Sequence, residues 1–193
     1  MFRRAILIAL LFGAASTASH AAETYVIDPN HTQVRFGYSH FGFANIVGMF
    51  TGVTGTIVYD IDSPEKSTVE AVIPIQNVHT GVSDLEDHLR SADFFEVERY
   101  PQATFKSTAV EKTGEHSLRV QGELNVKGMT HAVSLDVTIH AMRKHLATGR
   151  AALGLDAHTT LVRTELGVGK YAPNVSDQVD LQITVEANVP KPQ

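Results

Sequence analysis

The chain has 193 residues, a formal net charge of −5 at neutral pH and no cysteine. An acidic chain is a poor candidate for binding nucleic acid or anionic membranes, and without cysteine it has neither disulfides nor a lipid attached through that residue. Its length suits one domain with a substantial core.

The N-terminus has the pattern of a secretory signal peptide. Arg3 and Arg4 precede an apolar run from Ala5 to Ala15, and small residues follow as far as Ala22. The run is too short to span a bilayer and no second one follows, so we do not expect an integral membrane protein. We predict that residues 1–21 are cleaved and that residues 22–193 form one soluble periplasmic domain with a formal charge of −7.

Apolar and polar residues alternate through most of the mature chain. Val34, Phe36, Tyr38 and His40 share one face of a predicted strand, and polar residues lie between them. The same alternation recurs in the segments 51–61, 69–75, 103–107, 118–126, 133–141, 151–157 and 179–189. Short turns separate these segments, so we expect about eight antiparallel strands.

Strands with one apolar face each, and almost no helix to cover them, form either a sandwich or a closed barrel. We favour the barrel because the predicted strands Thr51–Ile61 and Gln178–Val189 are long. Gly52, Gly55 and Gly122 lie inside strands, where a coiled sheet has sharp bends. The predicted fold is therefore all-β, an eight-stranded antiparallel barrel, with the sandwich as the alternative.

One stretch, residues 82–105, changes from period two to helical spacing. Ser83 and Glu86 have the spacing of a capping box, in which the Ser83 side chain caps the first turn, and Leu85 and Leu89 recur one turn apart. A short helix is expected to begin at about residue 84. We expect it to act as a lid over one end of the barrel.

Two aromatic residues, Phe94 and Phe95, directly follow this predicted helix, and Tyr100-Pro101 then requires an extended backbone. With Leu85 and Leu89 they form an apolar group that is expected to face the barrel interior. We place the ligand at this end.

The sequence DLEDHLRSADFFEVERYPQATFKST, from Asp84 to Thr108, resembles the signature segment of the YceI-like family. The stretch from Tyr25 to Asp60, with Asp-Pro-x-His at its start, is similar to the opening of that family, and Gly122 to Val137 resembles its next hairpin. The resemblance spans almost the whole mature chain in order. One departure is Leu166, which stands where the family usually has an aromatic residue.

The resemblance implies a lipocalin-like barrel that binds polyisoprenoid lipids in the periplasm. We therefore expect a carrier for a long apolar lipid, a polyisoprenoid or an isoprenoid quinone, with no covalent cofactor. At about 0.8 kcal/mol per buried methylene, a chain of some forty carbons offers on the order of 30 kcal/mol gross. The side chains expected to contact the lipid are Phe36, Tyr38, His40, Phe50, Ile57, Leu85, Leu89, Phe94, Phe95, Phe105, Leu135, Val137, Leu155 and Ile183.

Other readings of the same barrel stay open at this point. Small inward residues suggest a hollow interior, and a solid core is the alternative. An enzyme acting on the bound lipid would draw on His40, Tyr38 or Arg35, although no nucleophile motif is present and we do not expect catalysis. A partner-binding stress-response module would expose Phe94 and Phe95. A homodimer is a further alternative.

The ten histidines do not have the spacing of a known metal motif, so no metal site is expected. His31 is interpreted as a turn residue that bonds the backbone near Asp28 and Pro29. His40 lies either on the wall of a cavity or in the core.

Overall fold

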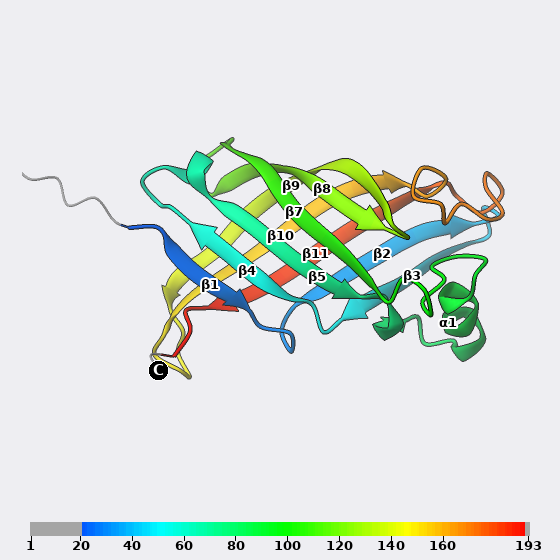
Figure 1. Ribbon diagram of the computed structural model, residues 1–193, viewed down its shortest axis with the longest axis horizontal. Coiled ribbons are helices and arrows are strands. Elements are labelled where there is room, and N and C mark those ends of the chain that lie inside the picture. Colours follow the sequence, from blue (N-terminus) through cyan, green and yellow to red (C-terminus); the bar gives the residue numbers. More distant parts are fainter. Residues whose placement is uncertain (1–20, 192–193) are drawn as a thin grey trace, which may run out of the picture.

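The computed structural model describes residues 21–191, which form an antiparallel β-barrel (Figure 1). All but the last residue of the predicted signal peptide, residues 1–21, lies outside this range. No helix of the described part is long and apolar enough to cross a membrane. In chain order the elements are β1 (Glu23–Ile27), β2 (Gln33–His40), β3 (Ala44–Thr51), β4 (Thr54–Tyr59), η1 (Pro64–Lys66), β5 (Thr68–Pro74), η2 (Ile75–Asn77), β6 (Val78–His79), α1 (Ser83–Arg90), β7 (Gln102–Lys112), β8 (Ser117–Val126), β9 (Met129–Lys144), β10 (Ala151–Val162) and β11 (Gln178–Asn188).

The barrel closes because β11, which pairs with β10 along one edge, pairs with both β2 and β1 along the other. Residues 180–184 of β11 pair with β2, and residues 187–188 pair with β1. Three strands of the barrel are interrupted: β1 continues as β2, β3 as β4, and β5 as β6. In the first two of these strands, β4 pairs with β1 and β3 pairs with β2. In the third, β5 pairs with β4 and β6 pairs with β3. Counted in this way the barrel has eight antiparallel strands, and the prediction of an eight-stranded barrel is confirmed.

The predicted strand Thr51–Ile61 is wrong in its extent. Thr51 ends β3, and β4 covers only Thr54–Tyr59. Gly52 separates them with a φ of +75°, in the left-handed region that favours glycine. Ile61 follows β4 and is 48% exposed, so it does not continue the inward face.

The start of α1 lies where the sequence predicts it, but the predicted Ser83 cap is wrong. Val82 is the N-cap residue, and no side chain caps the first turn. Instead the Glu86 carboxylate accepts hydrogen bonds from the backbone N–H groups of Thr80, at 2.7 Å, and Gly81, at 3.1 Å. Glu86 therefore stabilises the turn that precedes the helix. The Ser-x-x-Glu pattern is the same for this arrangement and for a capping box, so sequence alone does not distinguish them.

We expect Glu86→Gln to reduce hydrogen-exchange protection of residues 80–90 while the melting temperature of the barrel stays unchanged. Those backbone hydrogen bonds lower the pKa of Glu86, with the bond from Thr80 as the largest cause. A lowered pKa means that the stabilisation is complete above the ordinary glutamate range and is lost as the pH falls through the lowered value. Wild-type protection of residues 80–90 should therefore also fall at acidic pH.

Ser83→Ala is the matched control for Glu86→Gln, and we expect it to leave exchange in α1 unchanged. If Ser83→Ala reduced protection as much as Glu86→Gln does, the Ser83 hydroxyl would be the group that holds this helix terminus.

Candidate functional site

Side chains that face the barrel interior do not fill it. Leu181, Ile183 and Val185 of β11 line an internal cavity, yet each is only partly buried. Leu135 and Ile139 of β9 behave in the same way. Since these side chains point into the barrel, their exposed surface borders an internal space. The barrel is therefore hollow, and the solid-core alternative is wrong.

The volume of the cavity is about 320 Å³. Pockets that bind small molecules usually have volumes of about 300–1,000 Å³. The interior therefore has room for a ligand as large as a lipid tail.

All the side chains predicted to contact a ligand lie on the wall of this cavity. Most come from the barrel strands, and four come from α1 and the residues after it. The strand group is Phe36, Tyr38, His40, Phe50, Ile57, Phe105, Leu135, Val137, Leu155 and Ile183, and the second group is Leu85, Leu89, Phe94 and Phe95. Their contact with a ligand remains a prediction.

Residues 163–177, which connect β10 to β11, form part of the same wall and did not appear among the predicted residues. Leu166, Val168, Tyr171 and Val175 all border the cavity. Leu166 is 6% exposed, so an aliphatic residue closes the wall at the position where the family usually has an aromatic one.

Arg163 is buried and holds this connection in place. Its guanidinium donates hydrogen bonds to the backbone carbonyls of Ser176, at 2.7 Å, Val175, at 2.8 Å, and Val168, at 2.9 Å. Burial lowers the pKa of Arg163, and its guanidinium lies 5.9 Å from the centre of the Tyr38 ring. Arg163 therefore shapes the end of the cavity and places one positive charge beside it.

The residues after α1 meet the β10–β11 connection at one end of the barrel. The Phe94 and Tyr171 rings are 6.4 Å apart, and Lys170 forms an ion pair with Asp93. The backbone N–H of Phe41, in the β2–β3 turn, donates to the carbonyl of Asn174 at 3.0 Å. Three segments distant in sequence thus converge at the α1 end of the barrel (Figure 1). We call this end the mouth.

The polar side chains that line the mouth differ in exposure. His40 is exposed and stacks edge-on against Phe41, with ring centres 4.6 Å apart, so it belongs to the rim and not to the core. Tyr38 is half-buried, and burial raises its pKa. Arg35 is exposed and does not border the cavity. The three groups considered for catalysis therefore do not converge on one point.

The aromatic pair of the partner-binding alternative does not form an exposed patch. Phe94 is 8% exposed and Phe95 is partly buried against the core. Three exposed apolar residues of the mouth lie instead in the β2–β3 hairpin, where Phe43 is 94% exposed, Val47 61% and Phe41 49%. We call these three residues the rim patch.

Comparison with known sequences identifies the family. The model of the YceI-like domain matches residues 25–187, which is most of the chain. The chain belongs to the YceI-like family. A UPF0312 protein of Pseudomonas syringae pv. tomato is 34% identical over 184 residues, covering 93% of this chain and 95% of that protein. Protein YceI of Escherichia coli is 33% identical over 173 residues, covering 89% of this chain and 90% of its own.

Solved structures show that the barrel is shared. The crystal structure of Burkholderia cenocepacia BcnA has a TM-score of 0.75 at 21% identity, covering 83% of this chain and 98% of that one. A polyisoprenoid-binding domain from Saccharophagus degradans has a TM-score of 0.65 at 15% identity, covering 86% and 98%. At these identities the likeness concerns the fold, and it agrees with a YceI-like barrel.

Proposed function

We propose that this YceI-like protein is a periplasmic carrier that encloses the tail of one long apolar lipid, a polyisoprenoid or an isoprenoid quinone. The observation that carries the proposal is the hollow interior, whose wall consists almost entirely of aliphatic and aromatic side chains. A fold neighbour that is described as polyisoprenoid-binding supports the same class of ligand. The leader pattern of residues 1–21 supports the periplasmic location.

The energetics favour binding of a tail that fills the cavity. At about 0.8 kcal/mol per buried methylene, a tail of some forty carbons offers on the order of 30 kcal/mol gross. Loss of translational and rotational freedom costs roughly 4–15 kcal/mol, so a net gain remains for a tail that is largely buried.

The distribution of polar groups orients the ligand. Tyr38, His40, His88, Arg163 and Tyr171 border the cavity near the mouth, whereas the barrel wall beyond them is mainly aliphatic. A lipid would therefore enter tail first and leave its polar head group among these side chains. Tail length and shape, more than the head group, would then determine selectivity.

We further propose that binding proceeds without catalysis. Among the described residues around the cavity, the histidines contact aromatic rings and a carboxylate: His40 lies against Phe41, and His88 against Phe94 and Asp93. Neither forms the nucleophile–base pair that covalent lipid chemistry requires.

Native mass spectrometry of protein recovered from the periplasm tests this proposal. We expect a mature chain that begins near Ala22, accompanied by a species heavier by the mass of one prenyl lipid. Solvent extraction should release that lipid so that its mass and structure can be determined. A chain that still begins at Met1 would contradict the periplasmic form, and a ligand-free protein that takes up no added prenyl lipid would contradict the carrier.

A further inference from the structure

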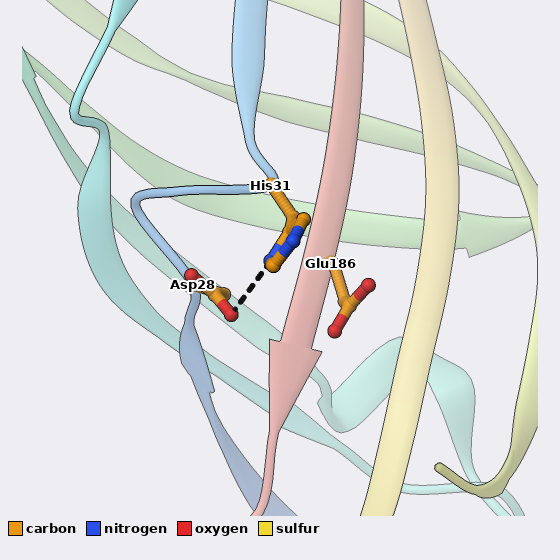
Figure 2. Close-up of side chains that lie close together, drawn as sticks. All are labelled: Asp28, His31 and Glu186. Atoms are coloured by element: carbon orange, nitrogen blue, oxygen red, sulfur yellow. Dashed lines mark hydrogen bonds and ion pairs between the residues drawn. The ribbon is translucent and has the colours of Figure 1, made fainter. Parts of the chain in front are cut away.

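A group of metal-ligating side chains lies away from the lipid cavity, on the outer surface of the barrel. Asp28 and His31 come from the turn between β1 and β2, and Glu186 comes from β11 (Figure 2). One ligand atom from each of the three side chains lies within 4.8 Å of the others. His31 Nδ1 is 3.0 Å from Asp28 Oδ2. None of these residues borders the cavity.

The backbone holds these three residues in a fixed arrangement. The N–H of Asp28 donates to the carbonyl of Glu186 at 2.8 Å. The Thr32 hydroxyl, in a residue 1% exposed, donates to the same carbonyl and accepts from the N–H of Glu186, both at 3.3 Å. The turn is therefore attached to β11 at the residue that supplies the third side chain.

Further hydrogen bonds hold one oxygen of each carboxylate and leave the other available. Asp28 Oδ1 accepts from the N–H of Asn30 at 2.9 Å, so Oδ2 is the oxygen that faces His31. Glu186 Oε1 accepts from Asn188 Nδ2 at 3.3 Å and lies 3.4 Å from His145 Nε2. Such supporting bonds around a ligand set are typical of metal sites.

His145 is oriented to support Glu186 and not to replace it. The N–H groups of Ala147 and Thr148 donate to His145 Nδ1, at 3.3 Å each. In a neutral ring the proton then resides on Nε2, which points to Glu186. His145 is thus a positioning residue that belongs to the β9–β10 connection.

A buried polar atom beside the cluster is unsatisfied. Asn188 is 7% exposed, and its Oδ1 has no hydrogen-bond partner in the described part of the chain. Buried amide oxygens usually have a partner, which is often a water or an ion shell. The nitrogen of the same Asn188 amide donates to Glu186, so the unsatisfied oxygen lies next to the ligand set without being part of it.

We propose that Asp28, His31 and Glu186 bind a divalent transition-metal ion of the zinc class. One imidazole nitrogen and two carboxylate oxygens are ligands that zinc accepts. Metal–ligand bonds of 2.0–2.1 Å place tetrahedral ligands about 3.3 Å apart. The His31–Asp28 pair, at 3.0 Å, would widen slightly, and ligand atoms up to 4.8 Å apart would approach by at most about 1.5 Å. The imidazole binds through the lone pair of Nδ1, so the ring proton resides on Nε2, and water completes the coordination.

The site lies where the barrel closes. Val26 and Ile27 pair with Asn188 and Ala187 in the short ladder between β1 and β11. A metal ion bound to Asp28, His31 and Glu186 connects these two strands at that ladder. We therefore expect it to raise thermal stability and to leave the shape of the lipid cavity unchanged. This inference is independent of the lipid function.

Calorimetric titration of the tag-free, chelator-treated protein with Zn²⁺ tests the site, and Co²⁺ absorbance reports its geometry. We expect one equivalent of Zn²⁺ to bind and to raise the melting temperature. His31→Ala and Glu186→Gln should abolish this binding. His145→Ala should weaken it about 10-fold to 100-fold with unchanged stoichiometry, as expected for a supporting residue.

His140→Ala is the matched control because His140 Nε2 lies 2.9 Å from Asp156 Oδ2 in a pair that belongs to no three-residue group among the described residues. Its Zn²⁺ binding should equal that of the wild type. Asp28→Asn preserves the acceptor for Asn30 and guards against loss of folding. Absence of one-equivalent binding, or equal binding by wild type and folded variants of Asp28, His31 and Glu186, would overturn the proposal.

Discussion

Leu135→Phe and Ile183→Phe should each weaken binding of a long prenyl chain about 50-fold. Both side chains border the cavity, from β9 and β11, the two strands that flank β10. Each substitution adds about three carbon atoms to the interior and displaces a similar number from the ligand, at about 0.8 kcal/mol each, which corresponds to that factor in Kd. Overpacking costs the free protein at most about 1–3 kcal/mol. Fluorescence titration with prenyl lipids of graded length measures the effect.

The length of the preferred tail should change together with the affinity. Because the cavity is finite, affinity should rise with tail length until the interior is filled and then level off. In the phenylalanine variants the affinity should reach its plateau at a shorter tail length. Ser134→Phe and Gln182→Phe add the same ring at exposed positions of β9 and β11, and their plateau should match that of the wild type. Unchanged binding by folded Leu135→Phe and Ile183→Phe would place the ligand outside the barrel.

Period-two alternation predicted most of the barrel correctly, and β3 shows where it fails. Gly48 is at an inward position of β3, opposite Phe36 in the ladder. A Cβ at Gly48 would lie 2.3 Å from the Phe36 ring, so the glycine makes room for the aromatic side chain. Val47 is apolar and faces outward. The inward position thus has a glycine and the outward position a valine. Alternation of apolar and polar residues therefore does not reveal β3.

Gly122 was interpreted from sequence as a bend, and it pairs with Ser107 at a register shift of the β7–β8 ladder. The structure gives a second reason for the glycine. A Cβ there would lie 2.4 Å from the Phe105 ring, which occupies the space above the glycine. This is the same arrangement as Phe36 over Gly48, and it depends on a neighbouring strand. A single strand's sequence does not reveal it.

Residues from regular strands were placed around the cavity because alternation alone determines which of them face inward. The β10–β11 connection, which contains Arg163 and Tyr171, has no periodicity. Its contacts with Asp93 and Phe94 depend on how the barrel brings this connection and the residues after α1 together. The group on the outer surface was missed for a related reason. His31 and Glu186 are brought together only by the pairing of β1 and β2 with β11.

Phe94→Ala should accelerate release of bound lipid and lower stability by up to about 3 kcal/mol, which is at the low end for removal of a buried phenylalanine. Phe94 is 8% exposed and contacts the rings of His88, at 5.0 Å, and Tyr171, at 6.4 Å, across the mouth. Its removal eliminates the aromatic contact between the residues after α1 and the β10–β11 connection. Stopped-flow transfer of a fluorescent prenyl lipid to excess vesicles measures the release rate.

Phe43→Ala is the matched substitution, because the same side chain is 94% exposed in the rim patch. Truncation there should change stability by less than about 0.5 kcal/mol. An exposed aromatic group beside an apolar opening is suited to contact a bilayer while the lipid crosses. Phe43→Ala should therefore slow uptake from vesicles but not from detergent micelles, whereas Phe94→Ala should accelerate release to both. Equal rates for wild type and both variants would mean that lipid passes through another part of the barrel.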